Sequence, residues 1–419
     1  MISVDAYRDQ VTELLGTTPA TAVPLADAAG LVLAEDVRAG VSLPPFDNSA
    51  MDGYAVRAAD VAGAGKDTPV ELPVADDIPA GRIDVAPLKP GTAHRIMTGA
   101  PLPPGADAVV MVEDTDRGTD VVRIFTAAMA NAHIRRLGED VAEGTVALRA
   151  GTVLGHSQLG LAAAVGLAQV RVHRPLRVLV ASTGSELVDA PEPLRHGQIY
   201  ESNSVMLAAA IRGLGCAVEV VRSVVDDVGE FRAVIEPKLA DADLLVTSGG
   251  VSAGAYEVVK DALTGQGVEF AKIAMQPGGP QGSGRWNGVP VVTLPGNPVS
   301  VLVSFEAFLR PALLTALGHT DIWRRQVRAR LTESMTSPRG RRQYRRGVYT
   351  PVLGEVTGIV GPRGGPGSHL LAAFTQANCL IVLPEDVDAA GPGVEGDVRD
   401  GGMCGRGPVA FKQDEEPAT

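Results

Sequence analysis

The amino-acid sequence predicts a multidomain α/β plus β protein. It has a central doubly wound parallel α/β domain, a β-rich inserted domain and a small C-terminal β-barrel-like domain. The chain has 419 residues, which is too long for one ordinary hydrophobic core. Between positions 177 and 317, short apolar runs alternate with longer helix-like stretches, the pattern of βαβ units. On both sides of that segment, short β-like runs are separated by Pro and Gly.

The N-terminal part begins with a predicted helix after Ser3, because apolar residues recur at helical spacing at positions 4, 7, 11, 14 and 15. Short β-like runs follow at 43–45, 68–72, 86–88, 108–113 and 121–125. A helix at 156–167 and a strand at 169–172 come next. We therefore expect a β-rich domain at 45–137, inserted into a discontinuous linker domain made of residues 1–44 and 138–173.

The central domain, at 174–319, has the clearest periodicity. The predicted strands are 177–181, 217–225, 243–247, 268–275 and 289–294, and the predicted helices are 203–214, 228–239, 257–264 and 299–317. A C-terminal β domain at 320–419 follows, with strands at 326–332, 343–350, 355–360 and 380–383. From residue 391 onward the chain is rich in Gly and acidic residues without periodicity, so we expect a frayed tail.

Composition excludes several classes of function. With 37 Lys and Arg against 49 Asp and Glu, the net charge is −12, and only 4% of the residues are aromatic, so nucleic-acid binding is disfavoured. The longest apolar candidate, 159–172, is interrupted at 166, 169 and 171, and residues 1–8 lack the apolar region of a secretion signal. We expect a soluble, cytoplasmic protein without membrane contact. Cys216, Cys379 and Cys404 lie far apart without a CxxC pair, which argues against a disulfide framework or a cysteine-rich metal site.

Three loops follow strands at the sheet edge where α/β proteins bind ligands. They combine hydroxyl residues, glycines and a proline-started helix, so that backbone N–H groups and helix dipoles can hold an anion. The candidate substrate-binding residues in them are Ser182, Thr183, Gly184, Ser248, Gly249, Gly250, Ser252, Pro295, Gly296, Asn297, Pro298 and Ser300. One such loop alone is more often a tight turn, but three at one edge indicate phosphate binding. No GxxxxGK[ST] segment occurs and no GxGxxG follows the first strand, which disfavours ATP hydrolysis and nicotinamide chemistry.

Acidic residues accompany these loops. Glu186 lies in the first loop, Asp226 follows the second strand, and Glu257 opens the helix after the TSGGVS loop. Carboxylates beside anion-binding loops are what a Mg²⁺ ion that bridges phosphates requires. For each residue alone, helix capping or a solvated surface is the alternative.

The most distinctive stretch of the β-rich domain is PPFDNSAMDGYAV at 44–56. It concentrates Asp, Asn, Ser and Gly beside an aromatic residue, more polar groups than a turn needs, although a structural Asx-turn is the alternative. Two further loops of this kind are MTGAP at 97–101 and GED at 138–140. The sequence therefore predicts a second group of functional side chains in this domain.

Together, the segments FDNSAMDGYAV, IMTGAPLPPGADAVVMVED, GEDV, STGSEL, QIYESN, TSGGVSAG, LPGNPVS, GSHLL and QANCLIVL resemble the molybdopterin molybdenumtransferases. These are the molybdenum insertases of molybdenum cofactor synthesis, and they are similar to the C-terminal domain of gephyrin. The resemblance covers about residues 3–385 in the family's order. It implies that adenylylated molybdopterin and molybdate bind as substrates, and that Mg²⁺-dependent cleavage releases AMP as molybdenum enters the dithiolene.

The resemblance also implies a homodimer, dimerised through the linker domain, with each active site shared between the α/β domain of one subunit and the FDNSAMDGYA-bearing domain of the other. Contact with the adenylyltransferase and with acceptor molybdoenzymes is implied as well. The catalytic candidates are Asp52, Thr98, Asp140, Glu186, Asp226 and Glu257, and the metal candidates are Glu186, Asp226 and Glu257. Arg342 and Ser368 match substrate-binding positions of the C-terminal domain.

Bound anions also require cations, because carboxylates repel molybdate. Lys272 and the cluster Arg341, Arg342, Arg345 and Arg346 are the candidates, with a solvated arginine face as the alternative. The chain departs from its relatives, many of which read PGKPxxFG where this chain reads PGGPQGSG, so Gly279 replaces an expected lysine. This departure favours a non-catalytic molybdopterin-binding or scaffold protein as the alternative function. A molybdopterin adenylyltransferase is a further alternative, although that enzyme needs only the α/β domain.

Overall fold

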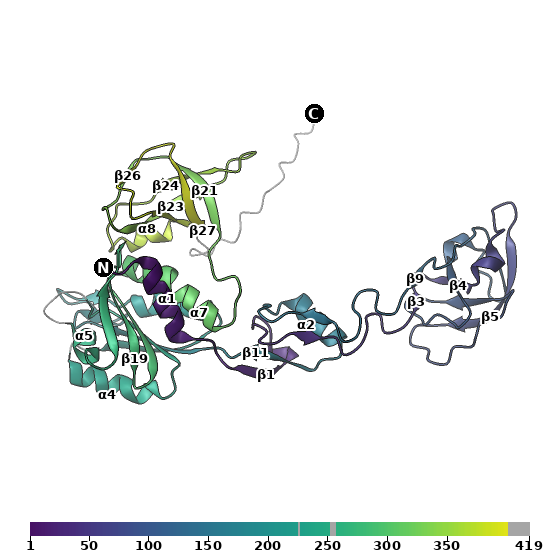
Figure 1. Ribbon diagram of the computed structural model, residues 1–419, viewed down its shortest axis with the longest axis horizontal. Helices are drawn as coiled ribbons and strands as arrows, with labels where there is room; N and C mark the ends of the chain where they lie inside the picture. The colour runs from purple at the N-terminus through teal and green to yellow at the C-terminus, as the bar shows by residue number, and fades with distance from the viewer. Residues whose placement is uncertain (225–226, 252–256, 401–419) are drawn as a thin grey trace. The chain divides into compact units, whose positions relative to one another are not determined.

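The computed structural model describes residues 1–224, 227–251 and 257–400 (Figure 1). These residues form two compact units. The β-rich unit comprises residues 22–172, and the α/β unit comprises residues 1–21 with the described residues from 173 onward.

A six-stranded sheet forms the centre of the α/β unit. Its strands, in spatial order, are β15 (Ala217–Val224), β12 (Arg177–Thr183), β16 (Leu244–Ser248), β20 (Val289–Leu294), β19 (Pro280–Trp286) and β17 (Val268–Lys272). The first four strands are parallel, whereas β19 is antiparallel to both of its neighbours. The predicted parallel α/β sheet is thus confirmed with an antiparallel edge. β19 was missed because its PQGSG segment has neither apolar alternation nor β-branched residues.

Helices cover both faces of this sheet, as doubly wound folds require. One core contains α1 (Val4–Leu15), α3 (Asn203–Arg212), α6 (Pro298–Ser304), the π-helical turn η4 (Phe305–Leu309) and α7 (Arg310–Ala316). The other contains α4 (Val228–Leu239) and α5 (Val258–Leu263). Alternation along β12 explains the division, since Val178 and Val180 lie in the first core and Leu179 and Ala181 in the second.

The N-terminal helix α1 belongs to the α/β unit. Ser3 caps it by accepting a hydrogen bond from the Ala6 amide at 3.2 Å, and Figure 1 shows α1 beside α7. Its Tyr7 ring packs edge-on against Phe308, with 4.9 Å between ring centroids. Residues 1–21 therefore belong to the α/β unit, whereas the sequence suggested one domain made of 1–44 and 138–173. The helical periodicity showed that this face of α1 is buried, but not which core buries it.

The continuous helical stretch Pro298–Ala316 is long and apolar enough to cross a membrane, judged by length and composition among the described residues. In this fold, 78% of its apolar window is buried within the α/β unit. That burial is what a core helix of this length requires.

The C-terminal domain is a closed barrel. Its strands β23 (Arg342–Thr350), β24 (Gly358–Pro362), β21 (Gln326–Leu331), β27 (Glu395–Asp400) and β25 (Cys379–Leu383) pair in that order, and β25 pairs with β23 to close the ring. A short strand from the α/β domain, β18 (Met275–Gln276), extends this sheet by pairing with β23. The shorter elements of the unit are β13 (Leu187–Val188), β14 (Ile199–Tyr200), β22 (Met335–Thr336), α8 (Leu371–Thr375) and β26 (Ala389–Ala390).

The expectation of a frayed tail from residue 391 was wrong for its first ten residues. Strand β27 pairs with both β21 and β25, so it is required for barrel closure. Its sequence, EGDVRD, contains one apolar residue, Val398, which is only 1% exposed. The strand is held by main-chain hydrogen bonds on both sides, which leave little hydrophobic periodicity in the sequence.

The β-rich unit contains three hydrophobic clusters, the smallest of which includes Ile78, Ile96 and Val109. One combines residues of 28–39 with residues of 154–172 and includes the helix α2 (His156–Ala164). Another lies under the five-stranded sheet β7 (Ala108–Met111), β4 (Gly53–Val56), β6 (Ala93–Ile96), β5 (Val70–Ile78) and β8 (Val121–Ile124). The sheet curls because the long strand β5 pairs with β6 through its second half and with β8 through its first. Domain boundaries at 45 and 137 stay a prediction.

Short pairs of strands complete the β-rich unit. They are β1 (Ala20–Pro24) with β11 (Gln169–His173), β2 (Val37–Arg38) with β10 (Val146–Leu148), and β3 (Asn48–Ser49) with β9 (Ile134–Arg135). Its 3-10 turns are η1 (Leu25–Asp27), η2 (Ala58–Val61) and η3 (Val112–Asp114).

Candidate functional site

The carboxyl edge of the parallel strands is lined by hydroxyl groups that lack partners. The side-chain oxygens of Ser182, Thr183, Thr247, Ser248 and Thr293 are buried and make no hydrogen bond within the described structure. They lie together because the strands are in register, with Ser182 opposite Ser248 and Thr247 opposite Thr293. Buried hydroxyls are nearly always hydrogen-bonded in proteins, so a cluster of exceptions indicates a site for a polar ligand.

The three predicted loops are packed against one another at this edge. Gly249 and Gly250 have φ angles of +91° and +63°, and a Cβ on Gly249 would lie 2.7 Å from the Thr183 carbonyl oxygen. A Cβ on Gly296 would lie 3.6 Å from the Cα of Gly249. The third loop is held by Asn203, whose Nδ2 donates to the Gly296 carbonyl oxygen at 2.7 Å. Glycine is therefore required where the second loop meets the first. The predicted residue Ser252 lies outside the described residues.

The helix that follows the third loop begins as predicted. Asn297 is its N-cap residue, Pro298 occupies the first turn, and the Asn297 carbonyl accepts the Val301 amide at 3.0 Å. The Asn297 side chain makes no capping hydrogen bond. Its amide group is consequently available to a ligand.

The predicted metal ligands are placed only in part. Glu186 is exposed and folds over Gly184, where an added Cβ would lie 2.6 Å from Oε2 of Glu186. Glu257 is half-buried at the N-cap of α5, and Asp226 lies outside the described residues. Within the described ranges, no three His, Cys, Asp or Glu side chains are grouped so that they could hold a metal ion. Both described carboxylates follow neighbouring, directly paired strands, β12 and β16.

Beside the third loop is a cleft of about 490 Å³. It is lined by Lys272, Ile273, Met275, Gln276, Pro277, Gly278, Gly279, Pro280, Pro295, Gly296, Asn297, Ser300, Arg341, Pro366, Gly367 and Ser368. The carbonyl of Ser368 accepts the Val299 amide at 3.1 Å, so the GSHLL loop of the barrel is joined to the start of α6. The structure thus brings Lys272, Ser300 and Ser368 to one cavity, as the sequence suggested.

Gly279 lies in this cleft at the position where a lysine was expected. A Cβ there would have only ordinary contacts, 3.5 Å to the Ile273 carbonyl oxygen and 3.7 Å to that of Met275. Its φ is not in the left-handed region, unlike that of Gly278 at +101°. The backbone therefore does not require glycine at position 279, and a Cβ added there would meet no steric conflict.

The arginine run of the barrel separates into three roles. Arg341 lines the cleft, whereas the guanidinium of Arg342, which the sequence had assigned to substrate, is paired with Asp5 and Glu385. Arg346 is buried and donates to the carbonyls of residues 363, 365 and 367, which shapes the loop that presents Ser368. Burial lowers the pKa of Arg346. Backbone carbonyl groups accept the hydrogen bonds of this buried guanidinium group in place of a carboxylate. Arg341 lies at the bend before β23 and Arg342 is the first residue of that strand, so the two side chains have different surroundings.

In the β-rich unit, the predicted residues Asp52 and Thr98 are in direct contact. Oδ1 of Asp52 accepts hydrogen bonds from the Thr98 amide and from Thr98 Oγ1, each at 2.7 Å. The backbone hydrogen bond from Thr98 lowers the pKa of Asp52, so this exposed side chain stays ionised at neutral pH. The arrangement presents an anchored carboxylate at the end of strand β6.

Other polar residues of the FDNSAMDGYAV segment have structural partners. Asp47 accepts the Leu137 amide at 2.8 Å and pairs with Arg136 at 2.5 Å, which lowers the pKa of Asp47. Ser49 bonds the Met51 backbone, as an Asx-like turn would. Asp140 is exposed in the loop that Asp47 supports, and its amide donates to the Leu43 carbonyl at 3.0 Å.

Comparison with known proteins covers almost the whole chain. Three family models match: the MoeA N-terminal region (domain I and II) at residues 2–166, a probable molybdopterin binding domain at 179–315, and the MoeA C-terminal region (domain IV) at 328–398. Molybdopterin molybdenumtransferase 2 of Mycobacterium tuberculosis is 54% identical over 402 residues, which are 94% of this chain and 98% of that protein. The chain belongs to the molybdopterin molybdenumtransferase family.

Further members support the assignment. The molybdopterin molybdenumtransferase of Haemophilus influenzae is 37% identical over 92% of this chain and 95% of its own length. The crystal structure of a MoeA molybdopterin biosynthesis protein from Pyrococcus horikoshii has a TM-score of 0.82 at 33% identity and covers 96% of this chain and 99% of that one. The family models match the regions on both sides of the α/β domain as well, which disfavours the adenylyltransferase alternative, since that enzyme needs only the α/β domain.

We predict that Gly249→Ala destabilises the α/β unit more than Gly265→Ala. Both glycines have positive φ, but an added Cβ meets nothing within 4 Å at Gly265, whereas at Gly249 it meets the Thr183 carbonyl. The expected loss in the free energy of unfolding is about 1 kcal/mol for Gly265→Ala and about 3 kcal/mol for Gly249→Ala. Denaturant unfolding of the full chain measures both values. Equal losses would mean that the contact between the two loops is unimportant.

Proposed function

We propose that this protein inserts molybdenum from molybdate into adenylylated molybdopterin and releases AMP. The observation that carries the proposal is the convergence of three anion-binding loops, five unpartnered buried hydroxyls and the cleft with Lys272 and Arg341 at one edge of the sheet. Family membership supports the same reaction. The molybdenumtransferase activity is the family's named activity, and AMP release is our extension of it.

The chemistry of the substrates fits these groups. An adenylylated pterin carries a phosphoanhydride, whose negative charge would be held by the backbone N–H groups of the glycine loops and by the hydroxyls of Ser248 and Thr183. Molybdate, an oxyanion, would bind in the neighbouring cleft between Lys272 and Arg341, with the Ser368 and Ser300 hydroxyls as further donors. The two substrates would then lie side by side.

We infer that Mg²⁺ assists this reaction. Glu186 and Glu257 provide carboxylate oxygens, the ligand type that Mg²⁺ prefers, at the ends of paired strands. A bound Mg²⁺ would neutralise charge on the phosphoanhydride during its cleavage. Removing divalent cations with a chelator should therefore stop AMP release.

We also infer a homodimer in which each site combines the α/β unit of one subunit with the β-rich unit of the other. The support is that the Asp52 carboxylate and the Thr98 side chain that holds it belong to the β-rich unit, whereas the three loops belong to the α/β unit. Gel filtration tests this inference, and a monomer would contradict it.

The buried free thiols of Cys216 and Cys379 suit a reducing cytoplasm.

The proposed function is tested by mixing the purified protein with adenylylated molybdopterin, molybdate and Mg²⁺ and measuring AMP. AMP that appears only when molybdate is present supports insertion. The second candidate function, a molybdopterin-binding protein without turnover, is favoured by Gly279 and Gln276, which leave the cleft with fewer cations. Tight pterin binding without AMP would support that candidate instead.

Replacing Asp52 with Ala should abolish turnover while the fold is retained. The change removes the carboxylate and both of its hydrogen bonds to Thr98, but it is made at an exposed site. Asp84→Ala is the matched control, because Asp84 is an acidic residue of the same unit whose side chain is 87% exposed. Rates of AMP release and circular dichroism are measured for both variants. An unchanged rate for Asp52→Ala would remove this residue from the site.

Gly279→Lys should strengthen molybdate binding about tenfold, because a charge-assisted hydrogen bond would be added in a position without steric conflict. Gly279→Gln is the control, since it adds a long side chain without charge. Isothermal titration with molybdate alone measures the dissociation constants. Equal affinities for the two variants would show that position 279 does not face the oxyanion.

A further inference from the structure

The first residues of the chain contact a cation-bearing segment of the cleft. Ile2 forms a parallel bridge with Ile273: its amide donates to the Lys272 carbonyl at 3.0 Å, and its carbonyl accepts the Ala274 amide at 2.8 Å. These bonds fix the backbone of Lys272 on the side opposite the cleft-lining loop. The segment 272–274 is thus held by the N-terminus as well as by its own sheet.

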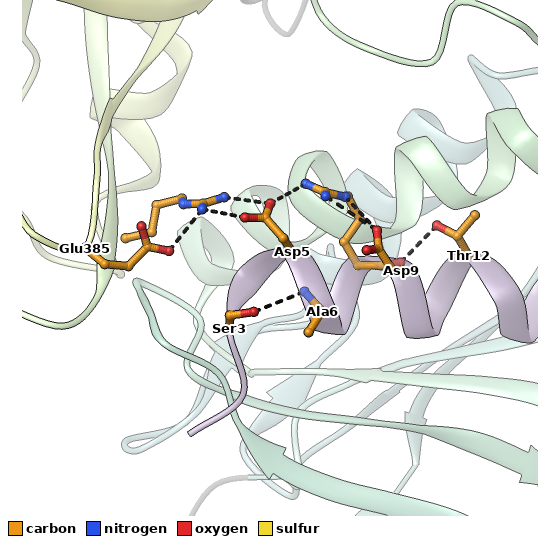
Figure 2. Close-up of polar contacts among 8 residues, drawn as sticks. Ser3, Asp5, Ala6, Asp9, Thr12 and Glu385 are labelled. Atoms are coloured by element: carbon orange, nitrogen blue, oxygen red, sulfur yellow. Dashed lines mark hydrogen bonds and ion pairs between the residues drawn. The ribbon is translucent and has the colours of Figure 1, made fainter.

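Three residues later, Asp5 binds the other cation-bearing segment. Its carboxylate makes a bidentate pair with Arg342, with 3.0 Å from Nη1 to Oδ1 and 2.8 Å from Nη2 to Oδ2. Figure 2 shows Asp5 between two guanidinium groups. Glu385 pairs with one of them, that of Arg342, on the side away from Asp5. Arg8 donates to Asp5 at 2.7 Å, and Glu385 lies 3.0 Å from Arg342.

The position of Arg342 determines that of Arg341. The Arg342 amide donates to the Ala274 carbonyl at 2.8 Å, and β23 starts there by pairing with β18. Arg341 lies at the bend directly before β23 and lines the cleft, whereas Arg342 does not, so the residue that Asp5 holds is bonded through the backbone to a cleft residue. The Arg342 side chain is only 16% exposed, so it has little freedom once paired.

We propose that Asp5 is a positioning residue for the oxyanion cleft, which it organises by holding Arg342 so that Arg341 faces Lys272 across the bound anion. This inference rests on the proposed function for its kinetic consequence. Its structural basis is the N-terminal clamp, by which we mean the contacts of Ile2 with 272–274 and of Asp5 with Arg342. The hydrogen bonds and ion pairs of the Asp5 side chain go to Arg8 and Arg342, neither of which lines the cleft, so its effect is exerted through Arg342.

The clamp is electrostatically stable over the working pH range. The hydrogen bond from Arg342 lowers the pKa of Asp5 to about 2, burial opposes this shift, and Arg8 adds to it. The Asp5 and Glu385 carboxylates both raise the pKa of Arg342. A carboxylate whose pKa is lowered on folding stabilises the fold above its ordinary pKa and loses that contribution only as the pH falls toward 2. The change in the KM for molybdate caused by removing the Asp5 charge should therefore be constant between about pH 6 and 9.

The test compares Asp5→Asn, Asp5→Glu and Asp9→Asn in the full-length protein. Asp9 is the matched control, because it is on the same helix, is 67% exposed and contacts Arg8 but not Arg342. We expect Asp5→Asn to raise the KM for molybdate roughly tenfold, with the KM for adenylylated molybdopterin unchanged. Asp5→Glu should restore part of the loss, Asp9→Asn should have no effect, and the ratio of KM values should not change from pH 6 to 9.

Hydrogen exchange separates this inference from the proposed function. In Asp5→Asn, amides of β18 and the start of β23 should exchange at least about fivefold faster, while those of β12 and β16 are unchanged. If the wild-type protein inserts no molybdenum, the proposed function fails, and the exchange rates still decide whether the clamp exists. An unchanged molybdate KM in an active Asp5→Asn variant, or unchanged exchange in β18 and β23, would overturn the proposal.

Discussion

The parallel pairing of β12, β16 and β20 is the constraint on which the site depends. Parallel strands in register bring their carboxyl ends to one edge, and every loop that follows must turn into a helix there. This geometry places the hydroxyls of Ser182, Ser248 and Thr293 within one small region although about 110 residues separate the first from the last. The glycines at 249 and 250 then let the loops approach closely, because an ordinary side chain would collide with the neighbouring loop. The ligand-binding character of the edge thus follows from strand direction before any particular side chain is considered.

Much of this fold was predictable from the sequence because its buried elements are periodic. The helix α4 begins and ends where its pattern predicts, and β20 does as well. Among the strands that were missed, β19 and β27 are held by backbone hydrogen bonds and contain few apolar side chains, so their hydrophobic pattern is weak. The partner of an apolar face is also hidden from the sequence, as α1 demonstrates. Its stripe predicts burial, but only the three-dimensional structure shows that it packs on α7.

The candidate site was predictable at the level of segments, but less so at the level of side chains. The sequence correctly suggested that LPGNP, Lys272 and GSHLL belong together, since all three line one cleft. It could not separate Arg341 from the three arginines of β23, because four identical side chains at positions 341–346 have the same chemistry and differ only in their surroundings. Arg341 faces the cleft, Arg342 faces an acidic helix, and Arg346 supports a loop. In the β-rich unit the same limitation applied to Asp47 and Asp52. The Asp47 carboxylate accepts the Leu137 amide and so stabilises a loop, whereas the exposed Asp52 carboxylate accepts a hydrogen bond from the Thr98 hydroxyl.

The link between Asp5 and Arg342 spans 337 positions of the chain, which has a consequence for the order of events on the ribosome. The β-rich unit, residues 22–172, makes its own contacts and can fold while the rest is being synthesised. The segment that contains α1 is made long before its binding partners at 273, 308 and 342. Its apolar stripe therefore cannot complete these contacts until residue 342 of the 419 has been made. The helix α1 is thus made early and docked late, and an apolar stripe that stays exposed in this interval is prone to aggregate.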